Sequence, residues 1–414
     1  MLLLAAVAAV PTPYSATITS GTIFSAEDGS PVHAHGAGLV LPDAHPGDGR
    51  TYFLVGTTKK HPSAWLSTGV NLYSSTDLQH WAFVRQIFNA SQITTRDAKA
   101  PPYRLERPKI LYNAATRRYV MWFHLDDAAF SMGNVGVAVS GEIGGAYQFL
   151  AGWRPDGLRS LDMGLFQEDG GAAYLVRSVD NQYVGFSRLT DDYTNTSAAG
   201  IVSRGPRCEG QAVWRERGPP SRLYLLCSHL TGWSANPLLL ARSDGAAIEN
   251  ATWTELGNPT HDATSFDSQS TYVLPLSLPQ GRLLLYMGDR WNAASESGGG
   301  SVGNASYVWL PLLRNASDPT GFTIADISPE GGKRKGDGAW RVAAYLQKDE
   351  EREPGAPAAS LSRLQLPQAE SFLAEGEGAA ASVPRLFELL WGLIPGRLAR
   401  GSGSRGSGVA VAAD

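Results

Sequence analysis

The sequence predicts an all-β protein, and within that class a five-bladed β-propeller, from three observations. Five short apolar segments each begin at or near a polar residue, a second apolar segment follows each of them, and turn residues separate the units. Repeated units that are too apolar to be stable alone are typical of repeat architectures. The first segments cover 35–40, 106–112, 162–166, 207–214 and 269–274, and the second segments cover 52–56, 119–124, 173–176, 223–227 and 283–287.

The first segment of each unit is expected to be the innermost strand of a blade. In a propeller these strands run along one central channel, so their starting residues come together at one end of it. The sequence therefore predicts that five polar side chains meet at one mouth of the channel, namely His35, Glu106, Asp162, Glu209 and Gln269.

The later part of a unit shows a recurring closure, in which a Ser or Asp turn is followed by an aromatic residue that begins the outer strand. This pattern occurs over 74–81, 137–149, 185–193 and 241–253. Turns at such regular spacing argue against an alternation of helices and strands.

Composition limits the classes of partner. The chain has 414 residues, with 35 basic and 39 acidic side chains and a formal net charge of −4. This balance leaves no basic field of the kind that binds nucleic acid. The 11 tryptophans and 15 tyrosines offer flat faces on which sugar rings can stack.

The chain is expected to have three regions. An apolar stretch over 1–10, followed by small and turn residues, predicts a secretory signal peptide over 1–16, with a disordered apolar terminus as the alternative. The propeller is expected over 20–345. The region 346–414 is rich in charge, Pro, Ala and Gly, which predicts a largely disordered, low-complexity tail. Its apolar segment at 386–394 is too short to span a bilayer, so no membrane span is expected.

Glycosylation motifs and cysteines bear on the compartment. Five Asn-x-Ser/Thr sequons favour a secreted glycoprotein; they begin at Asn89, Asn195, Asn250, Asn304 and Asn315. The two cysteines, Cys208 and Cys227, lie on the first and second strands of one predicted blade. Neighbouring strands can bring them within disulfide distance, and two buried thiols are the alternative.

Some candidate site residues have a purely structural alternative. His33 and His35 lie two apart on one strand face and could share a metal; the alternative is that one imidazole is buried and hydrogen-bonded while the other is exposed. Glu106 precedes Arg107 and Lys109 and could belong to a surface ion pair, but its place at a strand start favours a function.

Asp162 also has a structural alternative. An aspartate that precedes a strand often only caps a turn. Its position in the predicted ring of polar strand starts favours a function for it too.

Several motifs in this order resemble those of glycoside hydrolase family 43, and within it the exo-β-1,3-galactanases (galactan 1,3-β-galactosidases). They are found at 34–38, 106–109, 162–166, 228–233, 266–271 and 288–291. The resemblance implies a five-bladed propeller that hydrolyses β-1,3-linked galactose chains, such as those of arabinogalactan proteins, from the chain end and with inversion.

The resemblance also implies roles for single residues. The general acid would be Glu209, and Asp162 would tune the pKa of this acid and hold the sugar. Most of the family carries an aspartate base on the first inner strand, which here has none, and Gln269 would take the place of that base. Further substrate contacts would come from Glu106, His35, Thr231, Trp233 and Asp289.

The chain departs from the galactanase group at some positions, including Thr57 in place of a glutamate, Phe130 in place of an aromatic hydroxyl, and Gly210. These departures bear on the sugar that is recognised. The alternatives are an arabinofuranosidase or xylosidase of the same family and a non-catalytic carbohydrate-binding propeller. The expected partner is a polysaccharide or glycoprotein glycan bound by a monomer. No cofactor and no catalytic metal are expected, with a structural calcium ion as the alternative.

Overall fold

The computed structural model describes residues 12–59, 66–94, 102–216, 220–231, 234–291, 302–329 and 334–347. The chain divides into two units, 1–350 and 351–414, and all described residues belong to the first. Most of the predicted signal peptide and nearly all of the predicted tail therefore lie outside the described residues.

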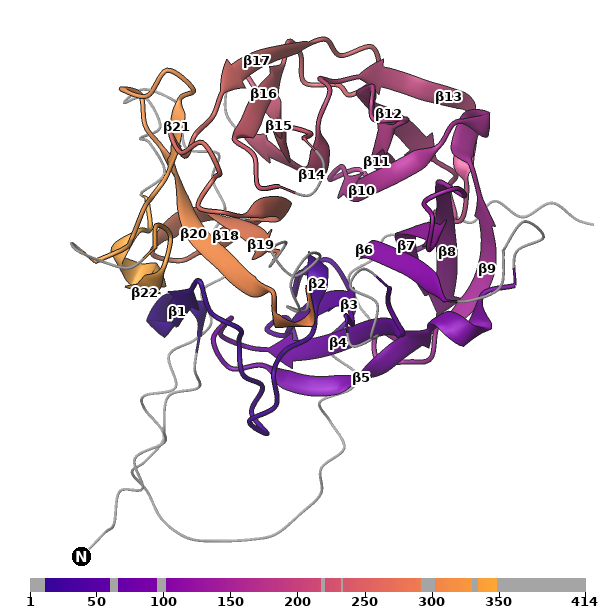
Figure 1. The fold of residues 1–414 in the computed structure, drawn as a ribbon, viewed down its shortest axis with the longest axis horizontal. Helices are drawn as coiled ribbons and strands as arrows, with labels where there is room; N and C mark the ends of the chain where they lie inside the picture. Colours follow the sequence, from indigo (N-terminus) through magenta and orange to yellow (C-terminus); the bar gives the residue numbers. More distant parts are fainter. Residues whose placement is uncertain are drawn as a thin grey trace, which may run out of the picture. The chain divides into compact units, whose positions relative to one another are not determined.

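Five four-stranded antiparallel sheets form the blades, and in each the strands follow one another in chain order (Figure 1). The first blade contains β2 (His35–Val40), β3 (Tyr52–Thr57), β4 (Gly69–Ser75) and β5 (Ala82–Asn89). The second contains β6 (Tyr103–Asn113), β7 (Arg118–Asp127), β8 (Asn134–Ser140) and β9 (Gln148–Trp153). The third contains β10 (Ser160–Gln167), β11 (Ala173–Val179), β12 (Tyr183–Leu189) and β13 (Thr196–Arg204).

The last two blades follow the same plan. The fourth contains β14 (Glu209–Glu216), β15 (Arg222–Ser228), β16 (Leu238–Ser243) and β17 (Trp253–Gly257). The fifth contains β18 (Gln269–Leu278), β19 (Gly281–Arg290), β20 (Ser306–Arg314) and β21 (Phe322–Ile324). Figure 1 shows β2, β6, β10, β14 and β18 around the centre of the ring. The five-bladed propeller is confirmed, and every predicted first and second segment coincides with an inner or second strand.

Apolar side chains on both faces of the strands hold the blades together. Successive side chains of a strand point to opposite faces. On β7, Met121 and Phe123 pack in a core cluster with the first blade, whereas Val120 and Trp122 pack in a cluster with the third. Five such clusters exist among the described residues, one at each junction between blades. This double burial explains why the second strands are apolar without alternation.

A small sheet outside the blades joins the two ends of the described chain. Strand β1 (Thr17–Ser20) pairs antiparallel with β22 (Gly338–Arg341). The pair lies against the fifth blade, because the Ser20 hydroxyl accepts a hydrogen bond from the Trp309 backbone N–H at 3.1 Å. Five single 3₁₀ turns complete the described elements: η1 (Pro13–Ser15), η2 (Ala90–Gln92), η3 (Pro155–Gly157), η4 (Val302–Asn304) and η5 (Val342–Ala344).

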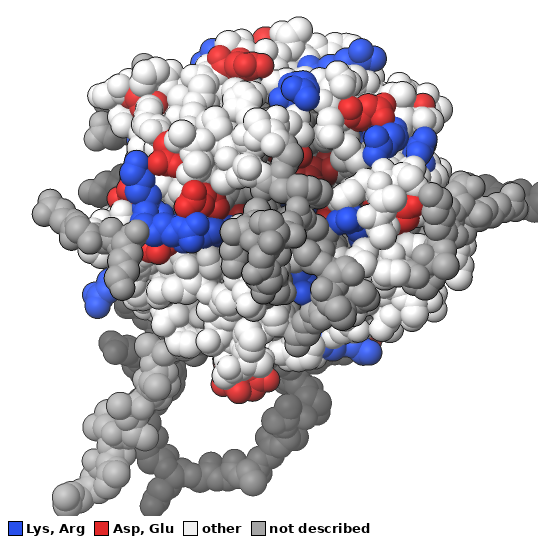
Figure 2. Space-filling model, in the orientation of Figure 1, with Lys and Arg blue, Asp and Glu red and all other residues white. Residues whose placement is uncertain are grey.

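Two features of the described residues concern the classes of partner considered from the sequence. On the face in Figure 2, acidic and basic side chains are interspersed, without a field of one sign. In the part of the chain that the structure describes, no helix is long and apolar enough to cross a membrane.

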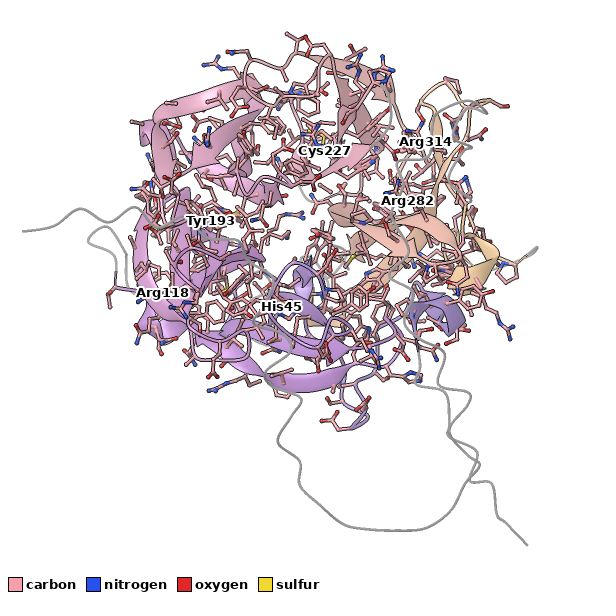
Figure 3. All side chains as sticks on the ribbon, turned by 180° about the vertical axis from the view of Figure 1, so that it is seen from behind. His45, Arg118, Tyr193, Cys227, Arg282 and Arg314 are labelled. Carbon is pink, nitrogen blue, oxygen red and sulfur yellow. A yellow bond between two sulfur atoms is a disulfide. The ribbon has the colours of Figure 1, made fainter. Side chains whose placement is uncertain are left out.

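The two cysteines form a disulfide bond, which decides between the two alternatives that the sequence left open. Cys208 and Cys227 have Cα atoms 5.8 Å apart, and Figure 3 shows the bond between their sulfur atoms beside the labelled Cys227. Cys208 immediately precedes Glu209, the first residue of β14. The disulfide therefore ties the start of the fourth inner strand to its neighbour β15.

Candidate active site

Every inner strand carries a β-bulge close to its start at the channel. In the second blade Glu106 pairs with His124 and Lys109 pairs with Trp122, so the inner strand has one extra residue. The other four inner strands shift register in the same way. A bulge bends its strand and re-aims the side chains on it. The fold thus turns side chains from five strands towards one end of the channel.

Two glycines in these bulges are required by close contacts. Gly36 and Gly210 have φ angles of 63° and 66°, a conformation that glycine adopts without strain. A Cβ atom on Gly36 would lie 2.9 Å from the backbone nitrogen of Arg107. A Cβ atom on Gly210 would lie 2.6 Å from the carbonyl oxygen of Ser270. The inner strands therefore approach one another too closely for larger residues.

One predicted position is offset. From the register of the third blade, Ser160 and not Asp162 corresponds to Glu106 and Glu209 at the strand start. Asp162 lies two residues further along, within the bulge. The sequence pattern could not distinguish these positions because the extra residue of a bulge leaves no mark in an apolar run.

The bulges surround a cavity of about 370 Å³, a size typical of ligand sites. Four of the predicted site residues line it: Glu106, Asp162, Glu209 and Gln269. The prediction that these side chains meet at one mouth is confirmed for these four residues.

Glu209 is the carboxyl group with the most unusual environment in this cavity. Burial, followed by the negative charge of Asp162, raises the pKa of Glu209 to about 8. The amide Nε2 of Gln269 donates a hydrogen bond to Glu209 Oε1 at 2.8 Å. Glu209 is therefore a neutral carboxylic acid at neutral pH, with one oxygen held by an amide.

Asp162 is fixed between two blades. The Nε atom of Arg107 lies 2.8 Å from Asp162 Oδ1, and the backbone N–H of Gly210 donates to Oδ2 at 3.0 Å. The Arg107 side chain is only 4% exposed, and it also donates to the Ser270 carbonyl at 2.8 Å. A hydrogen-bonded carboxylate is thereby held beside Glu209.

Gln269 is held by donors from two elements. Its Oε1 atom accepts hydrogen bonds from Arg107 Nη2 at 2.5 Å and from Trp291 Nε1 at 2.8 Å. An amide oxygen has two lone pairs, and these two donors occupy both of them. The orientation of the amide follows, with its N–H group directed at Glu209.

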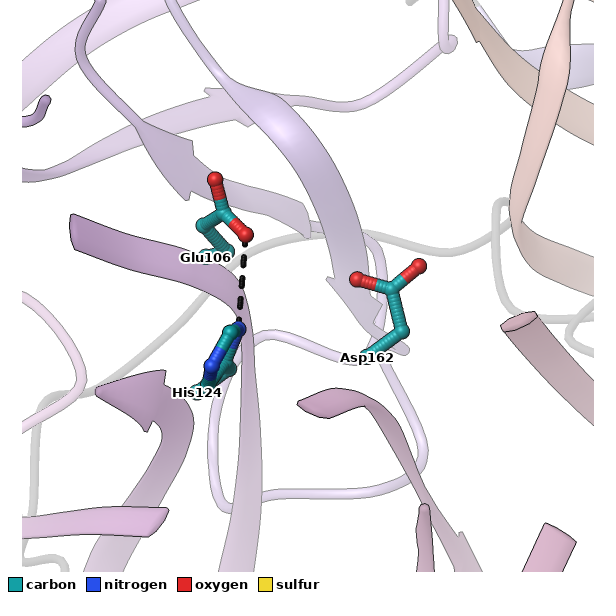
Figure 4. A group of neighbouring side chains, drawn as sticks. All are labelled: Glu106, His124 and Asp162. Atoms are coloured by element: carbon teal, nitrogen blue, oxygen red, sulfur yellow. Dashed lines mark ion pairs between the residues drawn. The ribbon is translucent and has the colours of Figure 1, made fainter. Parts of the chain in front are cut away.

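Glu106 has an environment opposite to that of Glu209. Its carboxylate lies 3.4 Å from Lys59 Nζ. It also lies 3.3 Å from His124 Nδ1, and Figure 4 shows this pair as a dashed line. Burial alone would raise the pKa of Glu106, but the charges of Lys59 and His124 outweigh burial and hold that pKa well below its usual range. Glu106 is therefore an anion at neutral pH.

His124 bridges two carboxylates. Its Nε2 atom lies 3.2 Å from Asp126 Oδ2, while its Nδ1 atom faces Glu106. Burial disfavours its charge, but Asp126 and Glu106 together raise the pKa of His124 to about 9. Asp126 in turn accepts hydrogen bonds from the backbone N–H groups of Met132 and Gly133. This chain of contacts fixes Glu106 in place.

Glu106 does not pair with its sequence neighbours, so the surface ion pair weighed from the sequence is not found. Arg107 and Lys109 are both buried, and Lys109 Nζ donates to the Gly36 carbonyl at 2.9 Å. The physical reason is the bulge, which directs Arg107 to Asp162 and leaves Glu106 facing Lys59 and His124.

Glu106, His124 and Asp162 have ligand atoms within 4.8 Å of one another, as a metal site would (Figure 4). Their other partners do not suit a cation. Lys59 and Arg107 already neutralise the two carboxylates, and His124 holds protons on both nitrogens below pH 9. We therefore propose that these residues hold no metal ion, including the structural calcium considered from the sequence.

His35 and Asp289 are not among the described residues that line the cavity. His35 Nδ1 is 3.4 Å from Asp289 Oδ1, and Asp289 Oδ2 accepts a hydrogen bond from the Gly36 backbone at 2.9 Å. Both are almost fully buried. Their geometry suits a role in holding the first and fifth blades together. The His33 and His35 rings lie 6.1 Å apart, and within the described ranges the only side-chain polar partner found for His35 is Asp289.

Two further predicted residues lie between β15 and β16 in the sequence. Thr231 is exposed, and its hydroxyl donates to Asn236 Oδ1 at 2.7 Å; the neighbouring Leu230, Ser234 and Ala235 line the cavity. Trp233 lies outside the described residues.

Sequence reasoning missed four cavity residues that hold the carboxylates or the Gln269 amide: Lys59, Arg107, His124 and Trp291. Arg107 and Trp291 lie within the motifs that carry the family resemblance, but no role was assigned to them. His124 carried a usable signal, since it ends the predicted second segment 119–124, and in β7 it lies directly opposite Glu106. Lys59 follows β3 and left no signal in the pattern.

Comparison with known proteins places the fold and site in context. No family model and no curated protein sequence matches the chain. Among solved structures, the exo-β-1,3-galactanase of Clostridium thermocellum has a TM-score of 0.63 and 29% identity, covering 74% of this chain and 65% of its own. The exo-β-1,3-galactanase of Phanerochaete chrysosporium, solved with galactose, has a TM-score of 0.64 and 27% identity, covering 77% and 70%.

A β-1,3-galactosidase of glycoside hydrolase family 43 is similar as well, with a TM-score of 0.65 and 26% identity, covering 80% of this chain and 64% of its own. The chain thus spans between 64% and 70% of the length of these relatives. These neighbours confirm the resemblance that the motifs indicated: in fold and in sequence the chain is similar to the exo-β-1,3-galactanases of glycoside hydrolase family 43.

Proposed function

We propose that the chain is a glycoside hydrolase that removes galactose from the ends of β-1,3-linked galactan with inversion, as in arabinogalactan-type glycans. The observation that carries the proposal is Glu209, a carboxylic acid with a pKa of about 8 on the wall of a sugar-sized cavity. Glycoside hydrolysis needs a carboxylic acid that is still protonated at working pH. Glu209 meets this requirement, whereas Glu106 does not.

The hydrogen bond from Gln269 assigns the two oxygens of Glu209. Because Oε1 accepts the amide N–H, the acidic proton resides on Oε2, which is free to protonate the glycosidic oxygen. As the bond from C1 to that oxygen breaks, a water molecule forms a new bond to C1 from the opposite face, and the proton that it loses passes to bulk water. Asp162 favours the neutral form of Glu209 until this transfer.

The role of Gln269 follows from the same contacts. An inverting enzyme separates its acid and base by about 6.5–9.5 Å, whereas Gln269 Nε2 lies 2.8 Å from Glu209 Oε1. In this arrangement Gln269 orients the acid. To orient the attacking water through Oε1, it would first have to release Arg107 or Trp291.

Galactan is proposed as the substrate because of the similar solved structures. The Phanerochaete galactanase was solved with galactose and, in a variant with one glutamate replaced by alanine, with β-1,3-galactotriose. In this chain Thr57 and Phe130 lie on the cavity wall, and they are two of the positions at which the resemblance implies other side chains. The sugar hydroxyls that they would face therefore need direct testing.

A secreted protein fits the proposal. Disulfides persist in oxidising compartments, and Cys208 and Cys227 form one. Four of the five sequon asparagines are exposed and accessible to glycosylation: Asn89, Asn195, Asn250 and Asn304.

Product analysis on a panel of polysaccharides tests the proposal. We expect free galactose from β-1,3-galactan, appearing first as the α-anomer in proton NMR, and no release from arabinan or xylan. Release of arabinose or xylose instead would make the enzyme a different member of the family. Binding of β-1,3-galactan without any release would make it a non-catalytic propeller.

A further inference from the structure

Two arginines on the cavity wall are not used by the proposed chemistry. Arg159 immediately precedes β10, and Arg207 lies two residues before Glu209 at the start of β14. Both line the cavity, as does Asn181 in the turn between β11 and β12. The two arginines flank this turn: the Asp180 backbone donates to the Arg159 carbonyl at 3.2 Å, and Arg207 Nε donates to the Asn181 carbonyl at 2.8 Å.

The other charged groups of the cavity are already neutralised. Lys59 pairs with Glu106 and Arg107 pairs with Asp162. Asp267 pairs with Arg334 at 2.8 Å. Glu209 is neutral at neutral pH.

Arg159 and Arg207, in contrast, bind only backbone carbonyl groups in the described part of the chain. Arg159 Nη2 donates to the Phe130 carbonyl at 2.6 Å, and Arg207 donates to Asn181. Among the described residues, no carboxylate lies within ion-pair distance of Arg159 or Arg207. The carboxylate of Asp180, on the turn between them, pairs with neither arginine. The described residues on this side of the cavity therefore leave two positive charges without a counter-charge.

The remaining donors suit an anion with several oxygens. Each guanidinium has five N–H groups in a planar fork, and each uses one in the contacts above. The stem of Arg159 is further held against Gly133, where an added Cβ would lie 2.9 Å from Arg159 Cβ. Such forks bind carboxylates, sulfates and phosphates through paired hydrogen bonds. A neutral sugar hydroxyl would leave most of these donors without an acceptor and would neutralise neither charge.

We propose that Arg159 and Arg207 form a subsite for an anionic substituent on the sugar chain, either the carboxylate of a uronic acid or a sulfate ester. The subsite adjoins the acid Glu209, because Arg207 lies two residues before it in the chain. Among the chains that the enzyme cleaves, the subsite would therefore favour acidic galactans. This inference rests on the proposed function for its biological meaning, but the anion site itself can be tested without turnover.

Binding of monosaccharides to the full chain tests the subsite, using calorimetry with galactose, galacturonate and galactose 6-sulfate. We expect one or both acidic sugars to bind on the order of tenfold more tightly than galactose, and the better of the two identifies the anion. The preference should weaken as salt is raised, because salt screens charges. Equal affinity for all three sugars would overturn the proposal.

Matched variants locate the effect. Arg159→Gln and Arg207→Gln should each remove most of the preference and leave galactose binding unchanged, with folding checked by circular dichroism. Arg204→Gln is the control, since Arg204 is exposed, stacks on Tyr183 and does not line the cavity. A preference that survives both cavity variants, or that is lost equally in the control, would contradict the assignment. Binding of acidic sugars without hydrolysis of any galactan would leave the subsite standing and reject the proposed function.

Discussion

The two sides of the cavity hold the same functional group in opposite states. On the second-blade side, Glu106 faces Lys59 and the imidazolium of His124, and its pKa is well below the usual range. On the fourth-blade side, Glu209 faces a neutral amide and the anion Asp162, and its pKa is about 8. Two glutamates at equivalent bulges thus become an anion and an acid, because the neighbouring groups differ.

The two sides are also fixed by different means. Glu106 is held through charged contacts that lead to Asp126 and the backbone around Met132. Glu209 follows a half-cystine, so its strand start is covalently tied to β15. A neutral acid cannot be held by strong ion pairs, and the disulfide stabilises this strand start without lowering the pKa of the acid.

The largest effect is expected from Glu209→Gln. Loss of the general acid should lower kcat on galactan by about a hundredfold or more. The wild-type rate should fall as pH rises through about 8, because the active form of Glu209 is protonated, and the variant should lack this limb. Its activity on an aryl galactoside with a good leaving group should fall much less. Near-normal turnover on galactan would remove Glu209 from the mechanism.

Gln269→Ala tests whether the amide orients the acid. We expect kcat to fall on the order of a hundredfold with little change in KM, since the hydrogen bond to Glu209 acts on the proton donor. Gln269→Glu provides the comparison, because a carboxylate beside Glu209 should shift the alkaline limb of the rate to higher pH. A raised KM with kcat nearly unchanged in Gln269→Ala would reduce Gln269 to a sugar contact.

His124→Gln tests the anionic side. Because the substitution removes the imidazolium that faces Glu106, we expect KM to rise by roughly tenfold and kcat to change much less. The pKa of Glu106 should rise, so the increase in KM should grow as pH is lowered. His80→Gln is the control. His80 also pairs with an aspartate, Asp77, but its side chain is 58% exposed and does not line the cavity. An unchanged KM would show that His124 does not position Glu106.

The smallest effect on rate is expected from the disulfide. Replacing both Cys208 and Cys227 by Ala should lower the free energy of unfolding by roughly 3 kcal/mol, given their sequence separation of 19. The folded variant should keep kcat within about twofold at 25 °C, because other contacts also hold β14. Urea unfolding and galactose release measure the two quantities. A large loss of kcat in the folded variant would mean that the covalent anchor itself positions Glu209.

The sequence was sufficient for the fold and for half of the site. Paired apolar segments identified all inner and second strands because both faces of those strands are buried between blades. It also identified Glu106, Asp162, Glu209 and Gln269. It could not show that a bulge offsets Asp162 by two residues.

The sequence also could not show which charged side chains pair with each other. Arg107 follows Glu106 in the sequence, which suggested an ion pair between them, but it binds Asp162 and Gln269 from other blades. Such contacts depend on the close approach of inner strands at Gly36 and Gly210, which only the folded ring defines.

The most direct test of the account is the titration of Glu209 itself. Carbon-13 NMR of glutamate side-chain carboxyl groups, with the Glu209 signal assigned by its absence in Glu209→Gln, would give its pKa in the free protein. We expect an apparent pKa near 8 for Glu209 and, for Glu106, a pKa well below the ordinary glutamate value. A value for Glu209 near 4.5, the ordinary value for a glutamate, would contradict the account.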